Sequence, residues 1–180
     1  MKRILKAFAL LLLIAPALLI TSCKKEEAKK EDLATIKKGW VTGTWKQTDI
    51  VLAYPIPFAG QRLPVGFSLH NIVGYLPVTG PQITATKDNL FTFDPKGTFS
   101  ITGSTDFIMP NAGNTGTWNL QVYGSALHLI SSDGKDTPLW IEDISTTTMK
   151  LGSLSNTVNV FEADPPDGAD IPVYFIFEKQ

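Results

Sequence analysis

The stretch Leu90–Thr102, LFTFDPKGTFSIT, decides the fold class of this chain. Apolar and polar residues alternate in Leu90–Asp94 and again in Thr98–Thr102, and the turn-forming residues Pro95-Lys96-Gly97 lie between them. Successive side chains of a β-strand point to opposite faces, so a period of two predicts a strand with one apolar face. The stretch therefore predicts a β-hairpin whose apolar side chains meet across its two strands.

The same alternation continues on both sides of this hairpin, between segments rich in Gly and Pro. In Thr115–Tyr123, we expect Trp118, Leu120 and Val122 to share a face. Eight or nine short strands, mostly joined as hairpins, favour an all-β fold, an antiparallel up-and-down barrel, because closure removes exposed sheet edges. A β-sandwich is the alternative. The further strands are expected over Val41–Tyr54, Thr115–Tyr123, Ala126–Ser131, Pro138–Ile144, Thr148–Leu154, Thr157–Glu162 and Ile171–Lys179.

Composition narrows the classes of function. The chain has 180 residues, a formal net charge of −1, one cysteine and two histidines. Such a charge is not typical of nucleic-acid-binding proteins, so we expect no nucleic-acid partner. A single cysteine excludes an internal disulfide and the Cys-rich zinc modules. Because no phosphate-binding glycine motif or metal-ligand spacing occurs, we expect no cofactor and no metal.

Catalytic motifs are also missing from the sequence. Gly66–His70, GFSLH, departs at its last position from the G-x-S-x-G pattern of hydrolase nucleophiles. An enzyme would need Ser68, His70 and an acidic residue that the fold brings close to them. We therefore expect a protein that is not an enzyme.

Residues 1–22 have the organisation of a secretory signal peptide. A basic start, MKRILK, precedes the apolar run Ala7–Ile20, which is shorter than the about 20 residues that a membrane-spanning helix needs. The run ends in Ile20-Thr21-Ser22-Cys23, which resembles the lipobox of bacterial lipoproteins. The resemblance implies that residues 1–22 are removed and that Cys23 carries a lipid anchor in a membrane.

Residues 23–38 are expected to form the lipidated Cys23 and a charged, solvated tether, because KKEEAKKEDLATIKK has few large apolar residues. Lys24 after the cysteine resembles the signals that send lipoproteins to the outer membrane. Glu26 and Glu27 resemble tags for export to the cell surface. We expect a lipid-anchored protein of the outer membrane that faces the cell surface or the periplasm. Residues 39–180, with seven basic and thirteen acidic residues, are expected to form one domain.

A tetrapeptide recurs in this domain, since Thr42–Trp45 and Thr115–Trp118 both read TGTW. Glycine in a strand lets another backbone approach closely, and a neighbouring tryptophan can cover the gap. Gly43, Trp45, Gly116 and Trp118 are therefore expected to be structural residues.

Together with the hairpin, these residues resemble the lipocalin-like domains of bacterial lipoproteins. The pattern consists of an opening GTWK strand, the F-x-F-x-x-x-G-x-F hairpin, a GTW strand, an L-x-L strand and an aromatic last strand. It covers residues 40–180 and implies an eight-stranded barrel. The arginine that stacks on the first-strand tryptophan in lipocalins has no counterpart, and Lys179 is the nearest candidate. The Thr-Asp-Tyr motif of vertebrate lipocalins is also missing, so their ligands do not carry over.

Residues 55–81, PIPFAGQRLPVGFSLHNIVGYLPVTGP, are too apolar to remain in water and longer than an ordinary loop. In lipocalins the connection after the first strand covers the barrel mouth. By resemblance, this segment closes a cavity or fills it. The candidate ligand-binding residues are Phe58, Phe67, Leu69 and Tyr75, together with Met109 from a second apolar loop, Phe107–Pro110.

Two functions are compatible with these features. The first is a membrane-anchored, non-enzymatic barrel that binds a small apolar or amphipathic ligand under residues 55–81. The alternative is a structural or interaction lipoprotein with a filled barrel, which contacts a protein or glycan through exposed aromatic residues. A cavity of about 300 Å³ or more would favour the first function. The aromatic residues expected in an exposed patch are Trp40, Tyr54, Tyr123 and Trp140.

Overall fold

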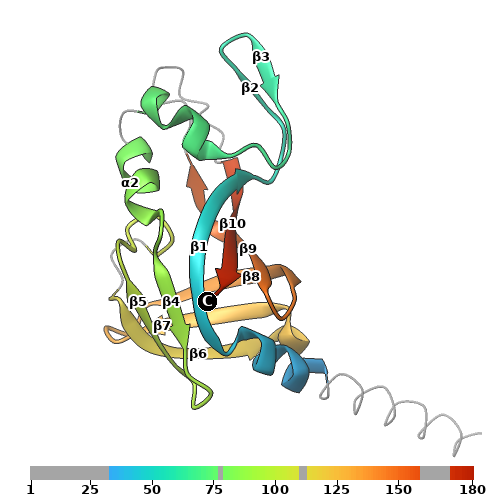
Figure 1. Ribbon diagram of the computed structural model, residues 1–180, viewed down its shortest axis with the longest axis vertical. Coiled ribbons are helices and arrows are strands. Elements are labelled where there is room, and N and C mark those ends of the chain that lie inside the picture. The colour runs from blue at the N-terminus through green and yellow to red at the C-terminus, as the bar shows by residue number, and fades with distance from the viewer. Residues whose placement is uncertain (1–32, 77–78, 110–112, 159–170) are drawn as a thin grey trace, which may run out of the picture.

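The protein is a closed antiparallel β-barrel of eight strands, seen in a computed structural model that describes residues 33–76, 79–109, 113–158 and 171–180 (Figure 1). The barrel order is β1-β10-β9-β8-β7-β6-β5-β4, and β2 and β3 form a separate hairpin. The predicted up-and-down barrel is confirmed, and the β-sandwich alternative is wrong. The elements are β1 Gly43–Leu52, β2 Ile56–Phe58, β3 Gln61–Leu63, η1 Leu69–Tyr75, α2 Thr79–Thr86, β4 Leu90–Phe93, β5 Thr98–Thr102, β6 Thr115–Gln121, η2 Val122–Gly124, β7 Ala126–Ser131, β8 Asp136–Ile144, β9 Thr148–Val158 and β10 Ile171–Lys179.

The β4–β5 hairpin has the register that its alternation predicts. Phe91 pairs with Ile101 and Phe93 pairs with Phe99, and all four side chains are buried in the barrel. The last strand closes the barrel on the first, with Trp45 opposite Lys179 and Leu52 opposite Val173. Inward-facing side chains from every strand form a single apolar core, which includes Trp45, Ile50, Leu52, Phe91, Phe93, Phe99, Ile101, Trp118, Leu127, Leu129, Leu139, Ile141, Met149, Leu151, Val173, Phe175 and Phe177.

Three of the expected strands differ from the structure. The strand expected over Val41–Tyr54 is shorter, since β1 begins at Gly43 and ends at Leu52, and Val41 is helical. Val122 and Tyr123 leave the sheet and form η2, with φ angles of 50° and 55°, so Val122 is exposed and does not share the face of Trp118. The chain reverses here because Ser125 donates its backbone N–H to the carbonyls of Gln121 and Val122. Thr157 is not the start of a separate strand, since β9 is continuous through Val158. The remainder of Thr157–Glu162 lies outside the described residues.

Residues 33–41 form a helix that packs against one end of the barrel (Figure 1). Val41 is fully buried, and the backbone carbonyl of Val41 accepts a hydrogen bond from Trp45 Nε1 at 2.7 Å. The backbone carbonyl of Trp40 accepts another from Lys179 Nζ at 3.1 Å. The described part of the expected tether, residues 33–38, is therefore helical and lies in a helix that contacts the barrel. Residues 1–32, with the expected signal peptide and Cys23, lie outside the described residues.

Candidate functional site

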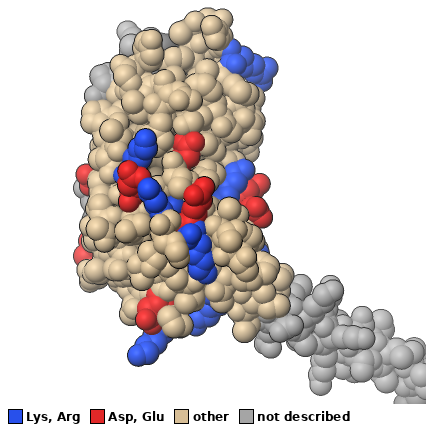
Figure 2. Space-filling view, in the orientation of Figure 1, with Lys and Arg blue, Asp and Glu red and all other residues tan. Residues whose placement is uncertain are grey.

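A cap covers the end of the barrel opposite the helix 33–41 (Figure 1). We define the cap as residues 53–86, the part of the β1–β4 connection that carries the β2–β3 hairpin, η1 and α2 and that ends before the charged residues Lys87 and Asp88. Arg62 is the only Lys, Arg, Asp or Glu in these 34 positions of the sequence. Figure 2 shows the consequence on one face, where most of the charged side chains gather around the middle of the barrel and few lie at the cap end.

The cap is attached to the barrel by backbone pairing and by apolar packing. Leu52 donates its N–H to Phe67 O at 3.0 Å, and Gly66 donates its N–H to Leu52 O at 2.9 Å, so the segment 66–68 extends the sheet beside β1. The inner side chains of the cap belong to the barrel core. They are Ile56, Leu63, Leu69, Ile72, Leu76 and Ile83.

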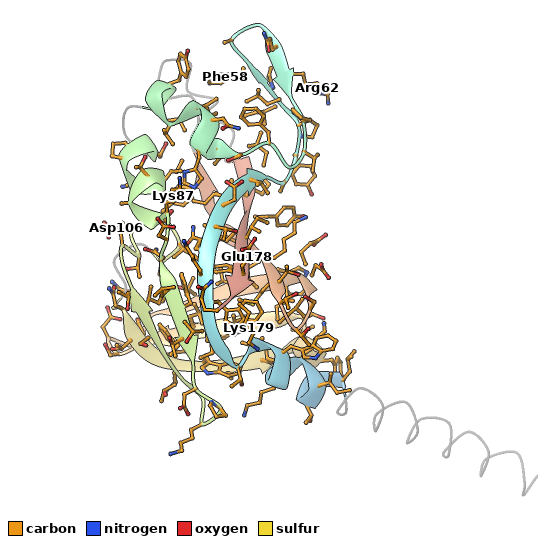
Figure 3. All side chains as sticks on the ribbon, viewed as in Figure 1. Phe58, Arg62, Lys87, Asp106, Glu178 and Lys179 are labelled. Carbon is orange, nitrogen blue, oxygen red and sulfur yellow. The ribbon has the colours of Figure 1, made fainter. Side chains whose placement is uncertain are left out.

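The outer surface of the cap carries large apolar side chains. Tyr54, Val65 and Tyr75 are exposed, and Tyr75 has 74% of its surface accessible. Phe58 packs edge-on against Tyr75 with 5.9 Å between ring centroids. Figure 3 shows Phe58 and Arg62 on the β2–β3 hairpin, at the far tip of the molecule. A partly aromatic surface of this kind, with Arg62 as its one charged residue, is typical of contact sites in soluble domains.

The five candidate ligand-binding residues occupy different places. The structure brings Phe58 and Tyr75 together at the surface of the cap. Phe67 is half-buried at the junction of the cap with β1. Leu69 and Met109 are fully buried in the apolar core.

The described inward-facing side chains pack closely inside the barrel. Residues that line a ligand-sized cavity keep surface accessible to solvent, but Trp45, Phe175 and Phe177 have none. Aromatic rings contact each other across the interior, with Phe91 5.0 Å from Phe177 and Phe93 5.6 Å from Trp118 between centroids. The second apolar loop adds to this packing, since Phe107 lies edge-on to Phe175.

The side chain of Gln47 is a polar group that points into this apolar interior. Gln47 is 1% exposed, and its amide Nε2 donates to Thr86 Oγ1 of α2 at 3.3 Å. Gln47 Oε1 has no hydrogen-bond partner among the described residues. A buried carbonyl without a donor is costly, so a water or a hydroxyl donor would bind there favourably.

A polar cluster of Asp49, Ser68 and His70 lies where the cap meets β1. Ser68 Oγ donates to Asp49 Oδ1 at 2.7 Å, and the backbone N–H of Ile50 donates to the same oxygen at 2.8 Å. His70 Nε2 is buried without a hydrogen-bond partner, 3.9 Å from Asp49 Oδ1. In a catalytic triad the imidazole lies between the hydroxyl and the carboxylate. Here the carboxylate lies between the other two groups, so Ser68 has no imidazole as general base.

The two TGTW segments contribute to the barrel in different ways. A Cβ on Gly43 would lie 2.7 Å from Lys179 Cε, and a Cβ on Gly116 would overlap the carbonyl of Ile130. Trp45 is fully buried, and the Lys179 ammonium lies 5.0 Å from its ring centre. Trp118 Nε1 donates to Asp94 O in the β4–β5 turn at 3.0 Å. Lys179 thus occupies the place that the resemblance gives to an arginine.

No protein-family model matches the chain, and no curated protein is significantly similar to it. In the part of the chain that the structure describes, three or more metal-ligating side chains never come together. Within the same residues, no helix is long and apolar enough to cross a membrane.

Proposed function

We propose that this protein is a membrane-anchored, non-enzymatic lipoprotein whose lipocalin-like barrel acts by surface contact with a protein or glycan. The observation that carries the proposal is the combination of a closely packed barrel core with a cap that has Arg62 as its one charged residue and on which Tyr54, Val65 and Tyr75 are exposed. A filled interior favours an outer binding surface, because an apolar ligand would have to displace well-packed aromatic rings.

The direction of the chain supports the same proposal. The lipid anchor is expected on Cys23, and the chain enters the barrel through the helix 33–41. The cap lies at the opposite end of the molecule (Figure 1). An anchor on Cys23 therefore holds the cap away from the outer membrane, where a partner can reach it.

The anchor is tested by cell fractionation. Cys23→Ser removes the thiol that would carry the lipid, and the chain 24–180 removes the signal peptide as well. We expect the chain 24–180, made without export, to remain soluble and folded, because every described element lies within residues 33–180. The native protein should partition with membranes, and its N-terminal peptide should carry acyl groups on Cys23 by mass spectrometry. An unmodified Cys23 in the membrane fraction would contradict the proposal.

The contact surface is tested with a photo-crosslinking amino acid at position 75 or 54 in the native cell. We expect cross-links to one defined protein or glycan at both positions and none from position 140, which lies on the barrel wall. Cross-linking that is equal at all three positions would contradict a role for the cap.

A small ligand remains the second candidate, and the unpartnered Gln47 Oε1 is the observation in its favour. Native mass spectrometry of protein purified from its own membrane distinguishes the two functions. We expect the mass of the acylated chain alone. A second, dissociable mass of a few hundred daltons, lost in Gln47→Leu, would favour a ligand with a hydroxyl or amide donor.

A further inference from the structure

A second apolar surface lies at the end of the barrel from which the chain leads to Cys23. We call it the anchor-end patch and define it as Leu33, Ile36, Val122 and Tyr123. These four side chains are between 44% and 60% exposed and make up half of the large apolar residues exposed in the described part of the chain. Most of the others, Tyr54, Val65 and Tyr75, lie on the cap.

Two elements far apart in sequence build this patch. Leu33 and Ile36 are three residues apart, so they lie on one side of the helix 33–41. Val122 and Tyr123 belong to η2, the turn between β6 and β7. The helix lies directly against that turn, because a Cβ on Gly124 would be 3.1 Å from Lys37 Cδ and 3.4 Å from Ala34 Cα.

The backbone of η2 is held in an unfavourable conformation to present these side chains. Val122 and Tyr123 both have left-handed φ angles, which β-branched and bulky residues rarely adopt. Val122, Tyr123 and Gly124 all have positive φ within the four-residue connection between the paired residues Gln121 and Ala126, and Asn and Gly adopt this region at the least cost. A stable barrel would be served better by Asn-Gly, so the presence of Val-Tyr points to a role outside folding.

Charge and chain length indicate which partner fits the patch. Lys37 and Lys38 follow Ile36 on the same helix, and the β4–β5 turn at this end of the barrel carries Lys96 together with Asp94, so basic residues are in excess here. Lysines beside exposed Leu, Ile and Tyr are typical of surfaces that lie on anionic lipid headgroups. Only nine residues, 24–32, lie between Cys23 and Leu33, and the ten steps from Cys23 to Leu33 span at most about 36 Å.

We propose that the anchor-end patch lies on the membrane surface and fixes the orientation of the barrel, with the cap facing outward. The proposal rests on the lipid anchor at Cys23 put forward above. The short connection keeps the patch at a high effective concentration near the bilayer, so a contact too weak to hold the free protein suffices to orient the anchored one. Tyr123 suits this position, because an amphipathic ring is favoured at the level of the headgroups.

The test couples the chain 23–180 through Cys23 to a maleimide lipid in nanodiscs of phosphatidylethanolamine and phosphatidylglycerol. Cys23 is the only cysteine, so the attachment is unique and does not depend on whether cells acylate it. A headgroup lipid carrying a spin label broadens the methyl signals of residues near the bilayer. We expect the methyl signals of Leu33 and Ile36 to lose more than half of their intensity, while those of Val65 and Ile56 in the cap keep theirs.

The decisive variant is Val122→Asn with Tyr123→Gly, which removes half of the patch and supplies residues that adopt positive φ angles more readily. We expect the double variant to unfold at a temperature equal to or above that of the parent chain. The difference in methyl-signal broadening between the anchor-end patch and the cap should be at least twofold smaller than in the parent chain. Val65→Asn, an equally exposed apolar residue on the cap, is the matched control and should change nothing. Equal broadening at both ends, stronger broadening at the cap, or an unchanged double variant would overturn the proposal. An unmodified Cys23 in native protein would instead overturn the lipid anchor and leave this result standing.

Discussion

The ammonium group of Lys179 lies 5.0 Å from the ring centre of Trp45 and donates a hydrogen bond to the backbone carbonyl of Trp40. The last strand is thereby joined both to the first strand and to the helix 33–41. One side chain therefore connects barrel closure to the segment that leads to the expected anchor.

Replacement of Lys179 tests this connection. Lys179→Met keeps most of the side-chain volume but loses the hydrogen bond and the cation–π contact. We expect a loss of about 2 kcal/mol in the free energy of unfolding and faster amide exchange in residues 38–41. Urea unfolding and hydrogen exchange measure the two effects. Lys179→Arg should retain most of the stability, since a guanidinium makes the same two contacts. Equal losses in both variants would show that the charge is unimportant.

Replacement of Gly116 tests whether the stability of the barrel depends on the close approach of β6 and β7. In Gly116→Ala, the new methyl group would overlap the Ile130 carbonyl and lie 2.8 Å from Ser131 Cα. Both are backbone atoms that cannot move without shifting β7, so we expect a destabilisation on the order of 3 kcal/mol. Gly74→Ala is the matched control, because no atom lies within 4 Å of its Cβ, and it should be neutral or slightly stabilising. Thermal unfolding of the two variants gives the comparison.

Replacement of Asp49 tests how the cap is attached to β1. Asp49→Ala leaves the Ser68 hydroxyl and the buried Ile50 N–H without their acceptor. We expect a loss of about 1–3 kcal/mol and faster proteolytic cleavage within residues 53–76. Asp49→Asn keeps a carbonyl oxygen at the same place and should preserve both properties. If Asn is as damaging as Ala, the negative charge of Asp49 is the important feature and the hydrogen bonds are not.

The raised pKa of Tyr174 predicts that the free energy of unfolding falls at alkaline pH. Burial raises the pKa of the Tyr174 hydroxyl, and the negative charge of Glu142 adds to the effect. The unfolded chain then loses this proton at lower pH, near about 10, than the folded protein does. The native state therefore keeps its full stability below that pH and loses part of it as the pH rises through the folded pKa.

The measurement is thermal unfolding of the parent chain and of Tyr174→Phe between pH 8 and about 11.5. We expect the parent to lose more stability over this range than the variant. Glu142→Gln should lie between them, because it removes the second cause of the shift. Parallel curves for all three proteins would contradict the role of Tyr174.

The sequence predicted the barrel because alternation is a local signal. The Phe91 and Phe99 strands, the β6–β7 pair and the last strand each show a period of two within a few residues. The helix 33–41 was not predicted because its large apolar residues on the barrel, Trp40 and Val41, lie together at its end, while Ala34 and Lys37 in its earlier turns form no apolar stripe. The short helix α2 was missed because Thr, Gly and Pro are poor helix formers, and packing of Ile83 in the core overrides that preference.

The candidate site was harder to predict from the sequence than the fold. Leu69 and Met109 are apolar residues in long loops, and nothing in their local sequence distinguishes a cavity lining from a core. The cluster of Asp49, Ser68 and His70 joins a strand to residues about twenty positions later, which only the folded backbone brings together. The lack of charge in the cap, by contrast, was visible in the sequence and could have indicated an exposed contact surface.

The pairing of β1 with β10 determines when this protein can finish folding. Trp45 and Lys179 are opposite each other although well over a hundred residues separate them. β1 can pair early with β4, but its other edge has no partner until the last strand is synthesised. Contacts of such high sequence separation form slowly, and an unpaired edge strand is open to aggregation in the meantime. Until β10 is in place, the free edge of β1 is therefore the part of the half-formed barrel most exposed to pairing with another chain.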